Sequence, residues 1–190
     1  MDQDISIAAK AIGRFEELER AGRAAITARR KAWQAAKEVL IETLTAVVGG
    51  APKVERGLYV THAAAFEHFD GVQLSFGAFP TGISLRTPNR QAWGFEHGPT
   101  LVFGQSESGL VVVVRYPAET TLPGGERESV PGDFVEAIEP TAIAGPIVLK
   151  IVTDFIEWAP SVTLAGSRAG TKQPIGFVPQ AQATMPREPG

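Results

Sequence analysis

A seven-residue hydrophobic repeat runs through the first 50 residues and is the clearest pattern in the chain. Apart from one glutamate, its successive positions are apolar, and they are Ile5, Ile12, Glu19, Ile26, Trp33, Leu40 and Val47. This spacing is the a series of a heptad repeat and predicts a long helix over residues 5–48. The d series is weaker and contains Gly22 and Arg29, so the apolar seam is narrow and interrupted near its middle.

The ends of this helix carry recognisable signals. Asp4 is a candidate N-cap, and Gly49-Gly50 followed by Pro52 predicts the end of the helix. A helix of about 44 residues, rising 1.5 Å per residue, is about 66 Å long, which is more than twice the width of a small domain. We therefore expect the helix either to project from the body or to bend. Gly22, in a run of small residues, is the place where a break or a close backbone contact is expected.

From residue 57 the pattern changes to short β-rich segments between turn signals. The predicted strands are 57–66, 72–79, 82–87, 91–96, 100–105, 109–116 and 133–139. Asp70-Gly71 is the strongest hairpin dipeptide. The four consecutive valines at 111–114 predict an interior strand covered on both faces, so a helix must lie across the sheet.

A second helix is predicted over residues 146–158, where Val148, Val152 and Phe155 share one face. The Ile and Val content of 147–152 leaves a strand possible there. Pro and Gly predict a long loop over 117–132 and a flexible tail over 166–190.

Together these elements predict an α+β fold. We expect a long N-terminal helix, an antiparallel β-sheet of about six or seven strands, one further helix near the C-terminus and a flexible tail. The expected division is a helix for oligomerisation or docking at 1–50, a β-rich globular domain at 51–165 that includes the helix 146–158, and the Pro-rich tail at 166–190.

Composition changes the picture mainly by exclusion. Among 190 residues, 18 Lys and Arg stand against 21 Asp and Glu, so no overall basic charge indicates a nucleic-acid coat protein. The absence of cysteine removes disulfides, thiolate nucleophiles and cysteine-based zinc sites. The acidic start and the lack of a long apolar run predict a cytoplasmic protein without a signal peptide or membrane span. Abundant Ala, and more Arg than Lys, hint at a bacterial source.

The charges are unevenly distributed along the chain. A basic stretch lies in the middle of the predicted long helix, and its candidate patch is Arg23, Arg29, Arg30, Lys31 and Lys37. Segment 119–139 holds six acidic residues against Arg127, a net charge of −5. The two regions could satisfy each other within a subunit or between subunits. Weak, sequence-independent nucleic-acid binding through 20–37 is a disfavoured alternative, because the sequence has no helix-turn-helix signal, no aromatic RNA-binding strand motif and no basic pI. Its three or four phosphate contacts would be salt-sensitive.

The candidates for chemistry are few. The three histidines lie near acidic residues, giving the possible metal-ligand set His62, His68, His97, Glu67 and Glu96. On the predicted strands, alternation places His62 and His97 on the same face as apolar residues. Such histidines are more often hydrogen-bonded core or rim residues than metal ligands. We therefore assign no metal site and expect no cofactor. Nucleophile-elbow, phosphate-loop and dinucleotide motifs are absent from the sequence, no catalytic residue is identified, and the question of enzyme activity stays open.

We therefore expect a non-enzymatic protein-interaction or regulatory assembly protein that forms homo-oligomers through its N-terminal helix. The predicted contact residues are Ile12, Phe15, Ile26, Trp33 and Leu40. In the alternative interpretation, the same stripe packs on the protein's own sheet. A second hypothesis is a small-ligand or metal-binding protein, or an enzyme, that uses the histidine region.

Overall fold

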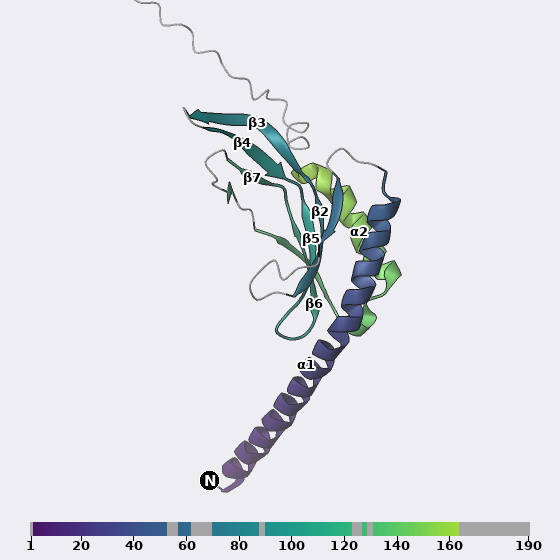
Figure 1. Cartoon of the computed structure of the whole chain (residues 1–190). Helices are drawn as coiled ribbons and strands as arrows, with labels where there is room; N and C mark the ends of the chain where they lie inside the picture. Colours follow the sequence, from purple (N-terminus) through teal and green to yellow (C-terminus); the bar gives the residue numbers. More distant parts are fainter. Residues whose placement is uncertain are drawn as a thin grey trace, which may run out of the picture.

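The computed structural model describes residues 2–52, 57–61, 70–87, 90–122, 127–128 and 131–163. It confirms the α+β class: a long N-terminal helix and a second helix near the C-terminus accompany antiparallel strands (Figure 1). The predicted tail at 166–190 lies outside the described residues.

The main sheet has five strands, and every neighbouring pair is antiparallel. In spatial order its strands are β1 (Leu58–Thr61), β2 (Gly71–Phe76), β5 (Thr100–Gln105), β6 (Val111–Tyr116) and β9 (Asp133–Ile138). A smaller sheet is formed by β3 (Ala78–Thr87), β4 (Arg90–His97), β7 (Glu119–Thr121) and β8 (Arg127–Glu128). Its strands come from the chain segments that connect β2 to β5 and β6 to β9.

The strand predictions differ from this arrangement in two places. Residues 117–132, predicted as one long loop, contribute the short strands β7 and β8, so the described chain has more strands than expected and they form two sheets. The predicted strand 72–79 is divided at Gly77, where the chain leaves the main sheet. Gly98 lies beside this point and donates its N–H to the Gly77 carbonyl, 3.2 Å away. A Cβ at Gly98 would lie 2.5 Å from the Phe76 Cβ, so only glycine fits.

The hairpin predicted at Asp70-Gly71 is wrong. The register pairs Thr61 with Gln73, so β1 and β2 are joined by a longer connection than a two-residue turn. Gly71 is instead the first residue of β2, and the Asp70 side chain binds the long helix.

Helix α1 (Asp2–Gly50) is continuous and starts before the predicted cap at Asp4. Neither a break nor a close backbone contact occurs at Gly22, where a Cβ would meet no described atom within 4 Å. The helix ends close to the predicted place, at Gly50, but it runs through both glycines, and neither Gly49 nor Gly50 has the left-handed φ expected of a glycine that stops a helix.

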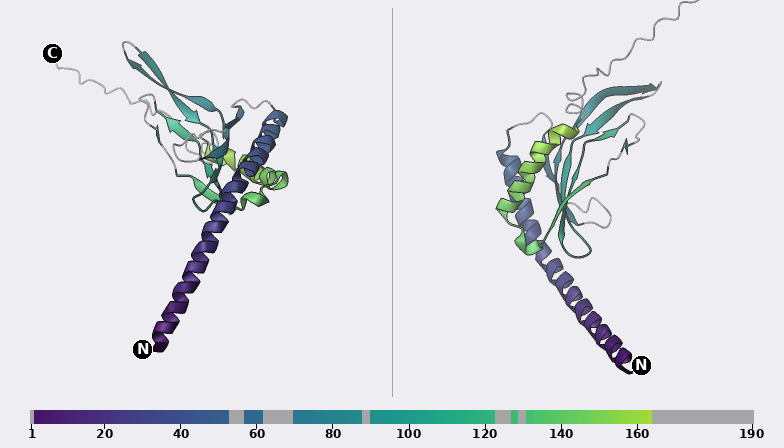
Figure 2. Two further views of the ribbon diagram at one scale, coloured as in Figure 1. Left: turned by 60° about the horizontal axis from the view of Figure 1, so that its bottom comes forward. Right: turned by 180° about the vertical axis from the view of Figure 1, so that it is seen from behind.

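Helix α2 (Gly145–Trp158) and the C-terminal half of α1 cover the same face of the main sheet (Figures 1 and 2). A short 3₁₀ helix lies on each side of α2, at Pro140–Ala142 and Ala159–Val162. The largest fully buried side chains of this core are Leu40, Leu44, Leu74, Leu101, Phe103 and Phe155. The valine run forms β6, which is an interior strand as predicted. The prediction that both faces of this strand are covered is not met by the described helices, which cover only the face that carries Val111 and Val113.

The sequence left open whether the apolar stripe of α1 packs on the protein's own sheet or projects from the body, and α1 does both. Its second half packs on the body, and Leu40 there is 0% exposed. Its first half projects away from both sheets, with the N-terminal end far from the body (Figures 1 and 2). Within the part of the chain that the structure describes, neither helix has the length and apolarity needed to span a membrane.

Replacing Leu40 with alanine tests how strongly the docked half of α1 stabilises the body. Leu40→Ala should lower the free energy of unfolding by about 2–5 kcal/mol, because it leaves a cavity between α1 and the sheet. The measurement is urea unfolding followed by circular dichroism. Leu149→Ala is the matched control, since Leu149 is 46% exposed on α2 and its loss should cost less than about 1 kcal/mol. Equal losses for the two variants would contradict this assignment of the core.

Candidate interaction surface

The projecting half of α1 carries large apolar side chains on its surface. Ile7, Ile12, Phe15 and Leu18 are between 61% and 73% exposed. Isolated exposed apolar residues are ordinary, but several on one projecting element indicate a contact surface. Residues 2–25, termed here the projecting segment, are therefore the candidate interaction surface.

This surface is a direct continuation of the stripe that forms the core. Eighteen residues of α-helix make five full turns. Phe15, Leu18 and Gly22 therefore point in the same direction as Trp33, Ala36 and Leu40, which are buried against the body. The apolar face of α1 thus extends beyond the region that the protein's own sheet covers. Leu18 and Ile7 were missed by the heptad series because they lie outside its a and d positions.

Polar contacts hold α1 at the point where it leaves the body. The Arg29 guanidinium binds the Glu139 carboxylate, with Nε 2.9 Å from Oε2. It also donates to the Ser108 carbonyl at 3.4 Å, and Arg30 donates to the Glu107 carbonyl at 3.2 Å. These contacts join α1 to the β5–β6 turn and to the residue after β9, and together they are termed the helix clamp.

The β5–β6 turn approaches α1 so closely that one position requires glycine. Gly109 has a φ of +81°, a conformation that other residues adopt only with strain. A Cβ at this position would lie 2.7 Å from the Arg29 Cβ and 3.2 Å from the Ile26 carbonyl oxygen. The backbone of the turn therefore rests directly on the helix.

A second carboxylate fixes the next two turns of α1. Asp70 accepts a hydrogen bond from the Trp33 indole at 2.8 Å and pairs with the Lys37 ammonium at 2.5 Å. The Lys37 hydrogen bond lowers the pKa of the Asp70 carboxyl; partial burial opposes this effect and the Trp33 hydrogen bond adds to it. The hydrogen bond from Arg29 likewise lowers the pKa of Glu139.

The basic patch predicted on α1 is largely engaged within the chain. Arg29, Arg30 and Lys37 bind the body through the contacts just described. Arg23 pairs with Glu19 along the helix at 3.3 Å, while Lys31 is exposed. The hypothesis that the basic stretch and the acidic region satisfy each other within one subunit is confirmed at Arg29 and Glu139.

The predicted partner-contact residues fall into two groups. Ile12 and Phe15 are exposed on the projecting segment, and Ile26 is half-buried at its end. Trp33 and Leu40 are buried in the protein's own core, so they are unavailable to a partner. Here the alternative interpretation, in which the stripe packs on its own sheet, is the correct one.

The histidine region shows no convergence in the described residues. His97 is half-buried on β4, with Nε2 3.0 Å from the Thr121 hydroxyl. Glu96 is buried, and because it is adjacent to His97 on a strand its side chain points to the opposite face. Among the described residues, His, Asp and Glu form no group of three that could hold a metal ion. His62, Glu67 and His68 lie outside the described residues, so a role for them stays a prediction.

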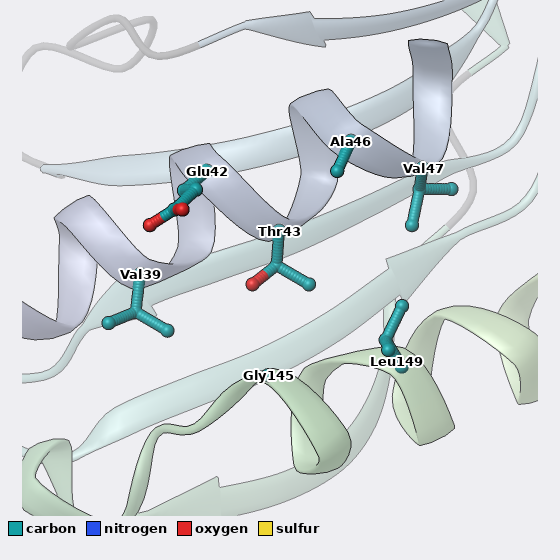
Figure 3. A pocket seen from close by; sticks show the side chains of 7 residues that line it. All are labelled: Val39, Glu42, Thr43, Ala46, Val47, Gly145 and Leu149. Carbon is teal, nitrogen blue, oxygen red and sulfur yellow. The ribbon is translucent and has the colours of Figure 1, made fainter. Parts of the chain in front are cut away.

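An open groove of about 570 Å³ lies between the two helices (Figure 3). It is lined by Val39, Glu42, Thr43, Ala46, Val47, Gly145 and Leu149. Glu42 is the only ionisable residue of this lining, and acid–base or nucleophilic catalysis ordinarily needs a second positioned group. The groove is therefore a gap between packed helices that offers no catalytic constellation.

Substituting Gly109 tests the contact between the turn and α1. Gly109→Ala should lower the free energy of unfolding by about 1–3 kcal/mol, because the new Cβ is strained at positive φ and meets the helix. Gly13→Ala is the matched control on the projecting segment, where a Cβ has no described neighbour within 4 Å. Urea unfolding of both variants measures the difference, and a loss for Gly13→Ala as large as that for Gly109→Ala would contradict the close approach.

The two carboxylates predict a dependence of stability on pH. Because their pKa values are lowered in the folded state, Asp70 and Glu139 stabilise the fold above their ordinary values near 4, and this contribution is lost as the pH falls through the folded-state values. Asp70→Asn should lower the urea midpoint at pH 7 and reduce its further decline between pH 5 and 2. Asp154→Asn, in an exposed pair with Lys150, is the control and should keep the wild-type profile.

Comparisons with known proteins add no assignment to this geometry. No protein-family model matches the chain, and it has no match among curated proteins or solved structures. The functional argument therefore depends on the surface of α1 itself.

Proposed function

We propose that the protein is a non-enzymatic interaction or assembly protein that self-associates through the projecting segment of α1. The observation that carries the proposal is the continuity of the apolar stripe. The face that packs on the sheet at Trp33 and Leu40 continues, exposed, at Phe15 and Leu18.

Helix stability supports a packing partner for this segment. A helical segment of about 24 residues without tertiary contacts is only moderately stable in water, since most helical stability in proteins comes from packing an amphipathic face. Fully burying a Leu, Ile or Phe side chain contributes about 1.5–3 kcal/mol. Pairing of the exposed Ile12, Phe15 and Leu18 with a similar surface would supply this contribution.

The two other hypotheses have weaker support. A ligand-binding or catalytic role for the histidine region would need converging side chains, but His97 and Glu96 point to opposite faces of β4. Nucleic-acid binding would need free basic side chains, but Arg29 and Lys37 are already paired with carboxylates.

The absolute mass in solution tests self-association. Light scattering after size exclusion should give the full chain at least twice its monomer mass of 20.2 kDa at concentrations of tens of micromolar or above. Phe15→Glu should shift the mass to that of the monomer, because it places a charge in the apolar contact. Ala24→Glu, which adds the same charge to the opposite side of the helix, is the matched control and should leave the mass unchanged.

A wild-type chain that remains monomeric at every concentration would contradict the proposal. So would equal losses of mass for Phe15→Glu and Ala24→Glu, because a specific contact through the stripe must distinguish the two sides of the helix.

A further inference from the structure

The sheet face that the helices cover continues beyond the main sheet. Leu74 pairs with Leu101 in the main sheet, and four residues away along each strand Ala78 pairs with His97 in the small sheet. Because the two spacings are equal, no residue is inserted at the junction, and the alternation of side chains is kept across it. Ala78 and His97 therefore lie on the same face as the buried Leu74 and Leu101.

On the small sheet this face is apolar and uncovered. Trp93 and Phe95 precede His97 at alternate positions of β4, and they are 48% and 41% exposed. Pro80 on β3 pairs with Phe95 and is exposed as well. Trp93, Phe95 and Pro80 are termed here the aromatic strip. The small sheet extends beyond the ends of α1 and α2, so neither of these helices covers the strip (Figures 1 and 2).

The aromatic strip and the projecting segment each continue one side of an interface that the protein already forms. Within the subunit, Trp33 and Leu40 from the stripe of α1 belong to one buried cluster with Leu74 and Phe103 from the sheet face. The projecting segment continues that stripe past the sheet, and the aromatic strip continues that face past the helices. The two exposed surfaces are therefore of the kinds that pack together in the core.

Resting on the proposed self-association, we infer that the projecting segment of one copy packs on the aromatic strip of a second copy. The two surfaces lie at opposite ends of the molecule, with the tip of α1 on one side of the body and the small sheet on the other (Figures 1 and 2). Because α1 is one continuous helix, a single subunit cannot bring them together. The contact therefore joins two copies.

Hydrophobic burial favours this pairing over a contact between two projecting segments. A helix-to-helix contact would leave the aromatic strip in water, whereas a helix-to-strip contact removes both exposed apolar surfaces at once. Large aromatic side chains contribute more than other residues to the free energy of an interface when they are buried at its centre. The pairing therefore buries the side chains that contribute most.

The sizes of the side chains on the projecting segment suit a contact with aromatic rings. Ala11 and Gly22 share the stripe with Phe15 and Leu18, and all four are exposed. Small residues between large ones leave depressions on a helix surface, and bulky side chains from the opposing surface can fill them. The aromatic strip offers such side chains in Trp93.

Two variants of the full-length chain, each lacking one surface, test the pairing. Phe15→Glu damages the projecting segment and Phe95→Glu damages the aromatic strip, because each places a charge in an apolar contact. At a concentration at which the wild-type chain is assembled, light scattering after size exclusion should give each variant the monomer mass of 20.2 kDa. Circular dichroism establishes that both variants are folded.

Leu85→Glu is the matched control on the small sheet. Leu85 is 51% exposed and pairs with Ala92, the neighbour of Trp93 on β4, so it lies on the opposite face of the sheet. This variant adds the same charge to an exposed apolar position and should keep the wild-type mass.

An equimolar mixture of Phe15→Glu and Phe95→Glu gives the decisive result. The first variant keeps an intact aromatic strip and the second an intact projecting segment, so the mixture should recover twice the monomer mass. Both substitutions add a negative charge, so the mixture gains no new electrostatic attraction. In a contact between two projecting segments, by contrast, Phe95→Glu would assemble by itself.

Trp93→Ala tests the strip without adding a charge. Truncating an aromatic residue at the centre of an interface should raise the concentration at which half of the chain is assembled by about tenfold or more. An unchanged concentration would overturn the inference, even if Phe95→Glu failed to fold.

The remaining outcomes distinguish this inference from the proposed function. A Phe95→Glu chain that keeps the wild-type mass would overturn the inference and leave self-association through the helix intact. So would a loss of mass in Leu85→Glu equal to that in Phe95→Glu, or a mixture that stays monomeric. A wild-type chain that is monomeric at every concentration would overturn the proposed function together with the inference.

Discussion

The packing of the second half of α1 on the main sheet is the interaction on which the rest of the structure depends. Leu40 and Leu44 from α1 meet Leu74 and Phe103 from the sheet, and α2 adds Phe155 to the same layer. The five-stranded sheet alone would leave this whole apolar face in water. The helix therefore completes the core. Because α1 is continuous, the direction of its projecting half follows from the orientation of the docked half on the sheet.

Directional polar contacts then fix the position of the docked half of α1 on the sheet. Apolar packing by itself tolerates sliding and rotation of a helix, because it depends on area more than on direction. The Asp70 carboxylate binds two residues of α1, and Glu139 binds Arg29 further toward the N-terminus. The partly exposed ion pairs contribute little net stability, but they define the angle at which the helix leaves the body.

The sequence predicted the elements with local signals and missed the contacts that depend on distant parts of the chain. The helix boundaries near Gly50 and Trp158 follow from Gly and Pro, and the strand 100–105 from its β-rich composition. The short strands β7 and β8 lack such a signal, because they exist only through pairing with β4 and with each other. The role of Asp70 also lacks a local signal. The Asp-Gly dipeptide is typical of a turn, whereas its actual role depends on Trp33 and Lys37, which are distant in the sequence.

The heptad pattern predicted Ile12 and Phe15 on the candidate surface but missed Ile7 and Leu18, and the reason is geometric. A heptad count has a period of 3.5 residues, whereas a straight helix has 3.6, and the difference turns the a series by about 20° per heptad. Over the length of α1 this drift moves Ile12 toward the edge of the face that Trp33 and Leu40 define. The five-turn spacing of Phe15 to Trp33 identifies the same face at both ends, but the point where the body stops covering it depends on the tertiary fold.

An unbroken α1 is also a lever arm. About 40 Å of helix separates Asp2 from the clamp at Arg29, and helices of this length curve only gently. A rotation of about 10° at the clamp would move the N-terminal end by about 7 Å, and a transverse force at that end produces a torque on the turn that Gly109 holds against the helix. Mechanical load on the tip is therefore delivered to the β5–β6 hairpin and to the end of β9, which are the strands at the centre and edge of the sheet.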